Sequence, residues 1–127
     1  MIDIDHFKSV NDRLDHTEGD GVLREISRLL AELTRADDLI CRWGGEEFVI
    51  LFPGCTPKAA AHRIEMANEQ LGTAPVAIVD GMPVRFSGGV SSVLTGDESI
   101  DRAIARADAA LYEAKRSGRA RVVTAAD

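Results

Sequence analysis

Apolar and polar residues alternate along the chain with two periods, one typical of strands and one typical of helices. In residues 1–5 apolar and acidic side chains alternate, which predicts a strand that ends in carboxylates. Residues 6–14 have the composition of a short helix, and the polar residues 16–20 predict a break. From Val22 to about Arg35 apolar residues recur every three or four positions, which predicts an amphipathic helix.

The middle of the chain has the pattern of a hairpin followed by a helix. Two apolar runs, 38–43 and 48–52, enclose a Gly-Gly turn, whose glycines are able to adopt positive φ angles. Thr56 and Pro57 have the residue types of an N-cap and a first helical position, so a helix is expected from there, closed by Gly72.

The last part of the chain predicts two strands, a helix and a final strand. The two strands cover residues 76–79 and 84–93. Ser99 is the candidate N-cap of the helix, Gly118 closes it, and residues 121–123 form the final strand.

Length and composition suit one compact domain over residues 1–127, with 45% hydrophobic and 28% charged residues. Because strands and helices alternate, we expect an α+β (mixed α/β) fold in which helices cover a mixed sheet. Lys and Arg number 15 and Asp and Glu 21, which gives a formal net charge of −6. This balance argues against a broad basic face for nucleic acid, and the 5% of aromatic residues argues against base-stacking platforms. A phosphorylated small molecule stays compatible, because its site needs only a few local cations or a metal ion.

The sequence predicts neither a membrane span nor a signal peptide. No apolar run approaches the roughly 20 residues that a span requires, and the first residues lack a basic region followed by an apolar stretch. Cys41 and Cys55 lie in unrelated contexts, which argues against a disulfide or a zinc site. We expect a cytoplasmic protein or the cytosolic domain of a membrane-anchored sensor. Because a strand begins at residue 1, we also expect the chain to be a part of something longer.

The Gly-Gly turn carries two adjacent carboxylates, Glu46 and Glu47, whose charges repel each other. A divalent cation would relieve that repulsion, and Mg²⁺ favours a few carboxylates together with substrate phosphates. Asp3 and Asp5, at the end of the first strand, are candidates for the remaining oxygen ligands. Glycines also let a nucleotide approach the backbone closely. An ordinary solvated turn is the alternative, and for this pattern alone it is the commoner one.

Five motifs extend this signal over residues 3 to about 123. They are Asp-Ile-Asp-His-Phe-Lys at 3–8, Asn-Asp at 11–12, His-x-x-Gly-Asp at 16–20, Arg-x-Gly-Gly-Glu-Glu-Phe at 42–48 and Ala-Asp-Ala-Ala-Leu-Tyr-Glu-Ala-Lys-x-x-Gly-Arg at 107–119. In their order and spacing they resemble the GGDEF family of diguanylate cyclases, in its GGEEF variant. The resemblance implies the fold of nucleotidyl cyclases and polymerase palms, with an antiparallel-centred sheet of about five strands surrounded by helices.

The resemblance also implies a reaction, in which two GTP molecules yield cyclic di-GMP and two pyrophosphates. It implies Mg²⁺ or Mn²⁺ as cofactor and a homodimer in which two GTP-loaded domains face each other. The family's opening helical segment is not in this sequence, and a sensor or receiver domain is expected upstream. The alternative is a catalytically weak or inactive domain that binds GTP or cyclic di-GMP within a larger signalling protein.

The residue assignments are carried over from the family position by position. The metal ligands are Asp3, the Ile4 carbonyl and Glu46, with Glu47 as a further ligand or as the general base; the catalytic residues are Asp3, Glu46 and Glu47. The GTP contacts are Asn11 and Asp20 for guanine, with Lys8, Lys115, Arg119, the amides of His6 and Phe7, and Gly44 and Gly45 for the rest of the nucleotide. Taken singly, Asp20 is equally an acidic residue near a helix start, and Lys115 and Arg119 equally offset charge at a helix end.

A second motif, Arg35-x-x-Asp38, resembles the family's inhibitory site, where the product cyclic di-GMP binds and restrains the enzyme. An arginine can hold guanine or phosphate bidentately, and an aspartate can accept from the guanine edge. The alternative is a solvated arginine at a helix end. The next helix offers Arg63 but has Glu65 where an arginine often stands in the family, so the site is expected to be incomplete.

Overall fold

A five-stranded sheet in the order β2-β3-β1-β6-β7 forms the centre of the molecule. The computed structural model describes residues 1–13, 16–74, 78–79 and 82–126. The strands of the sheet are β1 (Ile2–Ile4), β2 (Leu39–Arg42), β3 (Glu47–Leu51), β6 (Phe86–Val90) and β7 (Val122–Thr124). β1 is antiparallel to both neighbours, whereas β6 and β7 pair in parallel. A separate pair, β4 (Ile78–Val79) and β5 (Met82–Pro83), is antiparallel.

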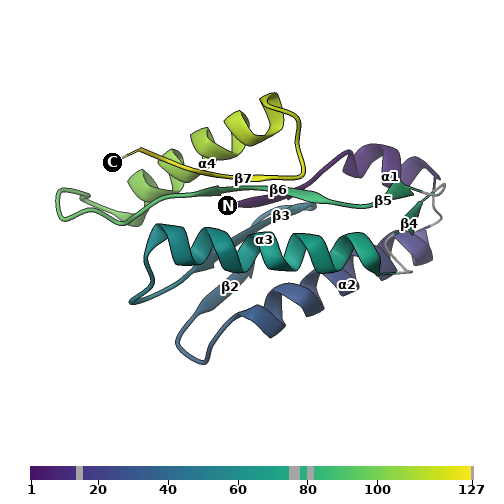
Figure 1. Cartoon of the computed structure of the whole chain (residues 1–127), viewed down its shortest axis with the longest axis horizontal. Helices are drawn as coiled ribbons and strands as arrows, with labels where there is room; N and C mark the ends of the chain where they lie inside the picture. The colour runs from purple at the N-terminus through teal and green to yellow at the C-terminus, as the bar shows by residue number, and fades with distance from the viewer. Residues whose placement is uncertain (14–15, 75–77, 80–81, 127) are drawn as a thin grey trace.

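Helices cover both faces of the sheet, as the sequence predicted. They are α1 (Phe7–Arg13), α2 (His16–Leu33), α3 (Pro57–Thr73) and α4 (Ile100–Arg116). α2 and α3 lie side by side on one face, and α4 lies on the other (Figure 1). The predicted fold class is therefore confirmed. Within the described part of the chain, no helix is long and apolar enough to cross a membrane.

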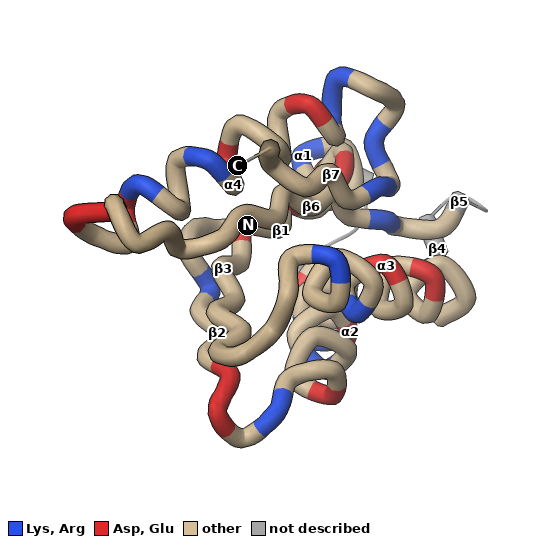
Figure 2. The backbone as a smooth tube through the Cα atoms, turned by 60° about the vertical axis from the view of Figure 1, so that its left-hand side comes forward, with Lys and Arg blue, Asp and Glu red and all other residues tan. Residues whose placement is uncertain are grey.

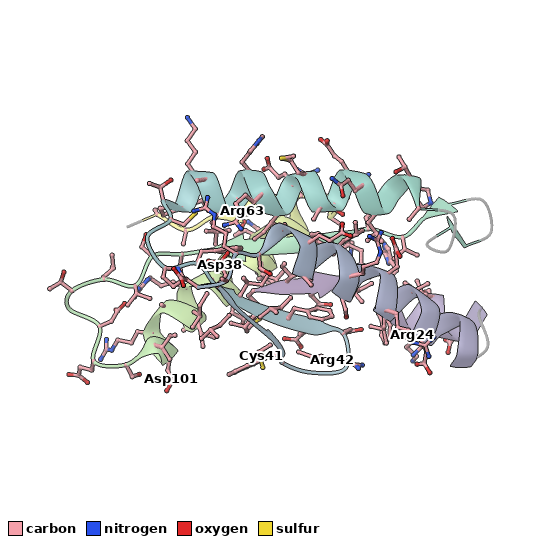
Figure 3. All side chains as sticks on the ribbon, turned by 90° about the horizontal axis from the view of Figure 1, so that it is seen from below. Arg24, Asp38, Cys41, Arg42, Arg63 and Asp101 are labelled. Atoms are coloured by element: carbon pink, nitrogen blue, oxygen red, sulfur yellow. The ribbon has the colours of Figure 1, made fainter. Side chains whose placement is uncertain are left out.

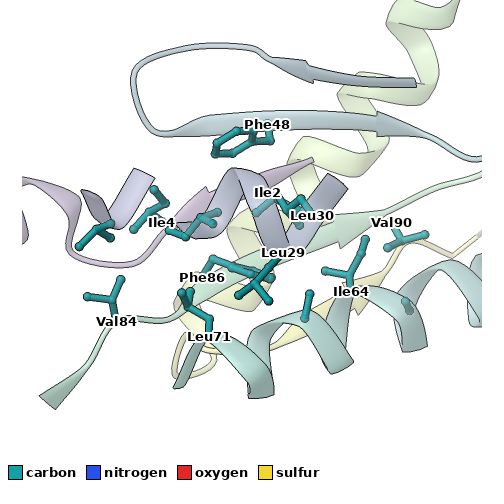
Figure 4. Packing of buried hydrophobic residues seen from close by; sticks show 14 of the residues in the cluster. Ile2, Ile4, Leu29, Leu30, Phe48, Ile64, Leu71, Val84, Phe86 and Val90 are labelled. Atoms are coloured by element: carbon teal, nitrogen blue, oxygen red, sulfur yellow. The ribbon is translucent and has the colours of Figure 1, made fainter. Parts of the chain in front are cut away.

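The main core lies between the sheet and the pair α2 and α3 (Figure 4). The largest fully buried hydrophobic side chains come from two strands, β1 and β6, and from both helices; they are Phe86, Ile2, Ile4, Ile26, Leu30, Leu71 and Val22. Because side chains alternate along a strand, Ile2 and Ile4 face this core and Asp3 between them faces the other side of the sheet. The alternation thus directs an acidic residue of the middle strand away from the main core.

Two adjacent glycines in β6 show how closely α4 approaches the sheet. A methyl group at Gly88 would make ordinary contacts with Val122 at 3.4 Å and Ile64 at 3.6 Å. A methyl group at Gly89, on the opposite face, would overlap the carbonyl oxygen of Ala107 and the backbone nitrogen of Leu111. The backbone of α4 therefore packs directly on the backbone of β6, which only glycine permits.

Helix caps were predicted well and helix boundaries less so. Thr56 accepts a hydrogen bond from the Ala59 N–H at 3.1 Å, as expected for the N-cap of α3. Ser99 accepts from the Asp101 N–H at 3.3 Å, and Gly118 follows α4 with a φ of 126°. The helix α3, however, ends at Thr73 with Ala74 as its cap, so the expected closure at Gly72 is wrong.

Three further predictions need correction. The predicted break at 16–20 is wrong, because α2 begins at His16; short polar residues belong to the first turn of a helix as readily as to a loop. The strand predicted over 84–93 is longer than the observed β6, which begins at Phe86 and ends at Val90. At its first residue, the Phe86 N–H donates to Asn68 Oδ1 at 3.0 Å and the Phe86 carbonyl accepts from Asn68 Nδ2 at 2.8 Å. Residues 76–77 of the strand expected at 76–79 lie outside the described residues.

Asp97 provides a test of pH dependence in the loop before α4. Arg106 donates to both of its oxygens at 2.9 and 2.6 Å and the Leu94 N–H donates at 2.8 Å, which lowers the pKa of Asp97 from 3.8 to about 2. A lowered pKa stabilises the fold above the unfolded value and stops doing so as the pH falls through the folded one. We expect Asp97→Asn to lower the thermal midpoint at pH 6, with the difference closing between about pH 4 and pH 2.

The matched control for Asp97 is Glu98→Gln. Glu98 contacts Arg102 at 3.8 Å with 86% of its side chain exposed, and such pairs contribute little. The measurement is a series of thermal melts from pH 7 to pH 2. A difference between Asp97→Asn and the unmutated chain that stays constant over this range would show that the ion pair is not its cause.

Candidate active site

Asp3, in the middle strand, is opposite Glu47 of β3 on one side and Ser87 of β6 on the other. Residues directly opposite each other in a ladder point to the same face, so Asp3 and Glu47 share the face covered by α4. From the last turn of α4, Lys115 Nζ donates to Asp3 Oδ2 at 2.6 Å. The structure thus brings together three predicted site residues from three separate elements.

The other oxygen of this aspartate, Asp3 Oδ1, is buried and has no hydrogen-bond partner in the described part of the chain. Nearby, burial and the charges of Asp3 and Glu47 raise the pKa of Glu46, while Lys115 opposes the rise. A buried acceptor without a donor is costly, by about 1–3 kcal/mol. This face of the sheet therefore carries more negative charge than Lys115 neutralises. A bound cation would offset the excess charge and would also give Asp3 Oδ1 a partner.

The turn between β2 and β3 is held by the side chain of Arg42. Its Nε and Nη2 donate to the carbonyl oxygens of Gly44 and Gly45 at 3.3 and 2.7 Å. The Gly44 carbonyl and the Gly45 N–H belong to one trans peptide and point in opposite directions. Since the Gly44 carbonyl faces Arg42, the Gly45 N–H points away from Arg42. Neither glycine uses the positive φ that glycine permits, so the conformation of the turn does not explain why glycine stands at these two positions.

Open space is the better explanation for these glycines. A methyl group at Gly45 would meet nothing within 4 Å, and one at Gly44 would meet only the Glu47 side chain, at 3.8 Å. The described fold therefore has room for larger residues here. Glycine keeps the backbone of the turn accessible from outside, beside Glu46 and Glu47.

The residues present fit a hard divalent cation. Carboxylate and carbonyl oxygens are the ligands that Mg²⁺ prefers, and Asp3 Oδ1 is a buried oxygen without a donor. Among the described residues, however, no three His, Cys, Asp or Glu side chains are close enough to hold an ion by themselves. The predicted ligand set of Asp3, Glu46, Glu47 and the Ile4 carbonyl therefore stays a prediction, and it would need further ligands from a bound substrate.

The predicted guanine contacts, Asn11 and Asp20, are exposed on α1 and α2. The Asn11 side chain lies against α2 at Gly19, one residue before Asp20, because a methyl group at Gly19 would come within 2.7 Å of Asn11 Oδ1. The absence of a side chain at Gly19 lets the Asn11 amide lie against α2, next to Asp20.

The predicted phosphate contacts gather where β1, α1 and the loop after α4 meet. Figure 2 shows Lys and Arg positions at the end of α4 and in the loop that leads to β7. Three exposed residues here have left-handed backbones: His6 with a φ of 54°, Arg119 with 62° and Ala120 with 49°. A left-handed conformation costs a residue other than glycine about 1–2 kcal/mol. Phe7 is half-buried at the start of α1, and Lys8 is exposed.

Asp5 does not act as the oxygen ligand that we considered for it. Its side chain is buried, with Oδ1 accepting from Ser87 Oγ at 2.6 Å and Oδ2 from the Ala120 N–H at 2.9 Å. Both oxygens already have protein donors. Asp5 therefore ties β1 to β6 and to the loop after α4.

The predicted inhibitory motif lies at the other end of β2 from the turn. The Asp38 side chain is 3% exposed; it accepts from the Arg35 N–H at 2.7 Å and from Arg63 at 3.1 Å. Arg63 also donates to the Leu33 carbonyl and stacks on Phe52, with 4.7 Å to the ring centroid. Figure 3 shows Arg63 and Asp38 facing each other between α3 and the loop before β2. One carboxylate oxygen of Asp38 is thus engaged by protein donors, whereas Arg35 is exposed.

The sequence did not predict the contacts of two residues that shape the site, Arg42 and Asp5. Arg42 was noted only as a part of a motif, although its position two residues before the Gly-Gly pair is the signal that it reaches the turn carbonyls. Asp5 was a candidate ligand, and no local signal reveals its partners, since Ser87 and Ala120 are 82 and 115 residues away.

Comparisons with known proteins show the family of the chain. The family model "Diguanylate cyclase, GGDEF domain" matches residues 1–121. Diguanylate cyclase DgcM of Escherichia coli (strain K12) is 42% identical over 126 residues, which cover 98% of this chain and 30% of DgcM. The active GGEEF domain of a diguanylate cyclase from Vibrio cholerae has a TM-score of 0.90 at 34% identity and matches 99% of this chain and 80% of that one. The GGDEF domain of DgcB from Caulobacter crescentus, in complex with c-di-GMP, has a TM-score of 0.87 at 32% identity, with 97% and 74% covered.

The fold is the one that solved GGDEF and GGEEF domains share, and it places acidic residues on the middle strand and on an adjacent glycine turn. The chain belongs to the GGDEF family of diguanylate cyclases. It spans about 30% of the length of curated relatives such as DgcM.

Proposed function

We propose that this domain is a diguanylate cyclase that condenses two GTP molecules into cyclic di-GMP. In each half-reaction a 3′-oxygen forms a bond to the α-phosphorus of the other GTP, the bond to the β-phosphate oxygen breaks, and pyrophosphate leaves. The observation that carries the proposal is the unpaired, buried Asp3 Oδ1 on the face that Glu47 and Lys115 share. An inactive domain has no use for such a costly arrangement.

Mg²⁺ or Mn²⁺ is the proposed cofactor, held by Asp3, Glu46 and the Ile4 carbonyl. When bound, it supplies charge stabilisation at the reacting phosphate and favours ionisation of the attacking hydroxyl. Glu47 is either a further ligand or the base that accepts the hydroxyl proton. Lys115, within hydrogen-bond distance of Asp3, offsets part of the negative charge that GTP brings.

GTP is proposed to lie across the face that carries Asp3, between α1 and the loop after α4. Asn11 and Asp20 would contact the guanine edge, where a carboxylate suits the N1–H and N2–H₂ donors. The phosphates would contact the backbone amides of His6 and Phe7. They would also contact three cations near the meeting point of β1, α1 and the loop after α4, which are Lys8, Lys115 and Arg119. Gly44 and Gly45 would let the nucleotide approach the turn.

Two such domains are needed, because each attacking hydroxyl belongs to the GTP of the other domain. We therefore propose a homodimer as the active form. Since the chain spans only part of its relatives, a sensor or receiver domain that pairs two copies is proposed in the whole protein. The proposed compartment is the cytoplasm, where GTP is available.

The test is incubation of the chain with GTP and Mg²⁺, followed by mass spectrometry for cyclic di-GMP. A second sample carries a fused coiled coil that forces dimerisation, because an isolated domain meets its partner rarely. We expect product in the dimerised sample. Tight GTP binding without product in either sample would favour the alternative function as a nucleotide-binding module.

Gly19→Ala tests the guanine contacts without touching them. We expect the added methyl group to displace the Asn11 amide and to weaken GTP binding by about tenfold, the value of one lost hydrogen bond. Stability should be unchanged or slightly higher, because alanine favours a helix over glycine. Calorimetric titration with GTP measures the first effect and urea unfolding the second.

Asn11→Ala is the matched comparison for Gly19→Ala. If the methyl group acts through Asn11, the double variant should bind GTP no more weakly than either single variant. Losses that multiply in the double variant would mean that Gly19 affects the nucleotide by another route.

We also propose that Arg35 and Asp38 form a product-binding site for feedback. The exposed Arg35 would bind cyclic di-GMP, and Asp38 would hold the turn that presents it. Arg35→Ala should weaken cyclic di-GMP binding by at least about tenfold and leave GTP binding unchanged. Arg24→Ala, another exposed arginine, is the control; equal product affinity in all three proteins would count against the site.

A further inference from the structure

Asp5 connects β1 with the loop after α4, the two segments that carry predicted phosphate contacts. In the described part of the chain its carboxylate is bonded to Ser87 and to the Ala120 N–H, neither of which is a predicted metal or guanine contact. Asp5 directly precedes His6, and its Oδ2 accepts from the Ala120 N–H, one residue after Arg119. Its own N–H donates to the Arg85 carbonyl at 2.9 Å, and the fully buried Ser87 donates to Oδ1. The carboxylate is therefore fixed by β6 on one side and holds the loop after α4 on the other.

That loop has a backbone that needs such an anchor. Three successive residues, Gly118, Arg119 and Ala120, have φ angles of 126°, 62° and 49°. Left-handed residues other than glycine persist only where their surroundings impose the conformation. The Arg119 N–H is bonded to the Ala114 carbonyl at 3.0 Å, and the next N–H is bonded to Asp5. These two bonds on successive peptides fix the direction in which the Arg119 side chain leaves the loop.

We infer that Asp5 is a positioning residue for phosphate binding, which holds Arg119 toward the triphosphate by anchoring the Ala120 N–H. The inference rests on the proposed function, because Arg119 is a phosphate contact only if GTP binds there. It assigns to the second aspartate of the Asp-Ile-Asp motif a role distinct from that of Asp3. Asp3 offers an unpaired oxygen, whereas Asp5 offers none.

The hydrogen-bond chemistry separates this role from a ligand role. In Asp5→Asn the amide oxygen can still accept from the Ala120 N–H, and the amide nitrogen can donate to the Ser87 hydroxyl, which is able to turn and accept. In Asp5→Ala both bonds are lost. A positioning role therefore predicts rescue by asparagine, whereas a ligand to a cation would lose its charge in both variants.

The experiment measures the binding of 3′-deoxy-GTP, which lacks the attacking hydroxyl, by calorimetry in the presence of Mg²⁺. We expect Asp5→Ala to weaken binding about tenfold, Asp5→Asn to stay within about threefold of the unmutated chain, and Arg119→Ala to weaken binding about tenfold. The double variant Asp5→Ala with Arg119→Ala should bind no more weakly than Arg119→Ala alone. Guanosine binding should be equal in all of them.

Two outcomes overturn the inference. One is unchanged 3′-deoxy-GTP affinity in folded Asp5→Ala, and the other is a loss of about a hundredfold in the double variant, the product of the single effects. If the unmutated chain does not bind 3′-deoxy-GTP, the proposed function is overturned. If it binds and either outcome above is found, the role of Asp5 is overturned and the proposed function stands.

A measurement on the unmutated chain covers the case in which Asp5→Ala does not fold. The Ala120 amide should exchange its hydrogen slowly in NMR spectra, because it is bonded to a buried carboxylate, and Asp5→Asn should keep most of this protection. Exchange as fast as that of an unbonded amide in the loop would remove the anchor and overturn the inference.

Discussion

Glu47→Gln is expected to reduce cyclic di-GMP formation by between about a hundredfold and ten-thousandfold, the range for a lost general base. The side chain keeps its size, and the like charge opposite Asp3 disappears, so the fold should be at least as stable. The measurement is the initial rate of product formation from GTP and Mg²⁺ by the dimerised chain, with circular dichroism as the check on folding. Glu69→Gln, an exposed change on α3, is the control and should have the unmutated rate.

The same variant separates the two roles open to Glu47. If Glu47 is a metal ligand, a higher Mg²⁺ or Mn²⁺ concentration should restore part of the rate. If it is the base, the loss should persist at saturating metal and shrink as the pH rises, because hydroxide replaces the base. A Glu47→Gln protein that works at the rate of the Glu69→Gln control would contradict both.

Gly89→Ala should destabilise the domain by about 3–5 kcal/mol, which is a large part of the total for a small protein. The added methyl group overlaps the backbone of α4 at Ala107 and Leu111, and backbone cannot turn aside as a side chain can. Helix α4 must then move off the sheet, and its buried small residues lose their contacts; these are Ala103, Ala107, Ala110 and Ala114. Because Lys115 belongs to α4, the site should be damaged as well.

Gly88→Ala is the matched control, one residue earlier in the same strand. Its methyl group points to the other face, 3.4 Å from Val122, and we expect a change below about 1 kcal/mol. Urea unfolding of the two variants and the unmutated chain measures the difference. Equal midpoints for Gly88→Ala and Gly89→Ala would mean that α4 does not pack as closely as described.

Local patterns predicted the elements of this fold, whereas its long-range pairings needed the structure. The Thr56 and Ser99 caps were predicted because capping depends on neighbouring residues alone. The start of α2 was missed because residues 16–20 contain no apolar residue whose period could be detected. The parallel pairing of β6 with β7 joins segments separated by all of α4, and no periodicity reports such a contact.

The same division holds for the candidate site. Glu46 and Glu47 were candidates from their own chemistry, and the resemblance supplied Asn11, Asp20 and Lys115. What the sequence could not predict is how the side chains are used. Asp38 turns one carboxylate oxygen toward Arg63, and Asp5 turns both of its oxygens toward protein donors.

The position of β1 in the middle of the sheet has a consequence for the order in which the domain is made. Asp3 is synthesised long before its strand neighbour β6 and its counter-ion Lys115, the latter 112 residues on. Contacts of such sequence separation form slowly, because a long loop must close first. A nascent chain on the ribosome therefore exposes its acidic residues before it has the means to neutralise them. The domain acquires its site in the same step in which it completes its fold.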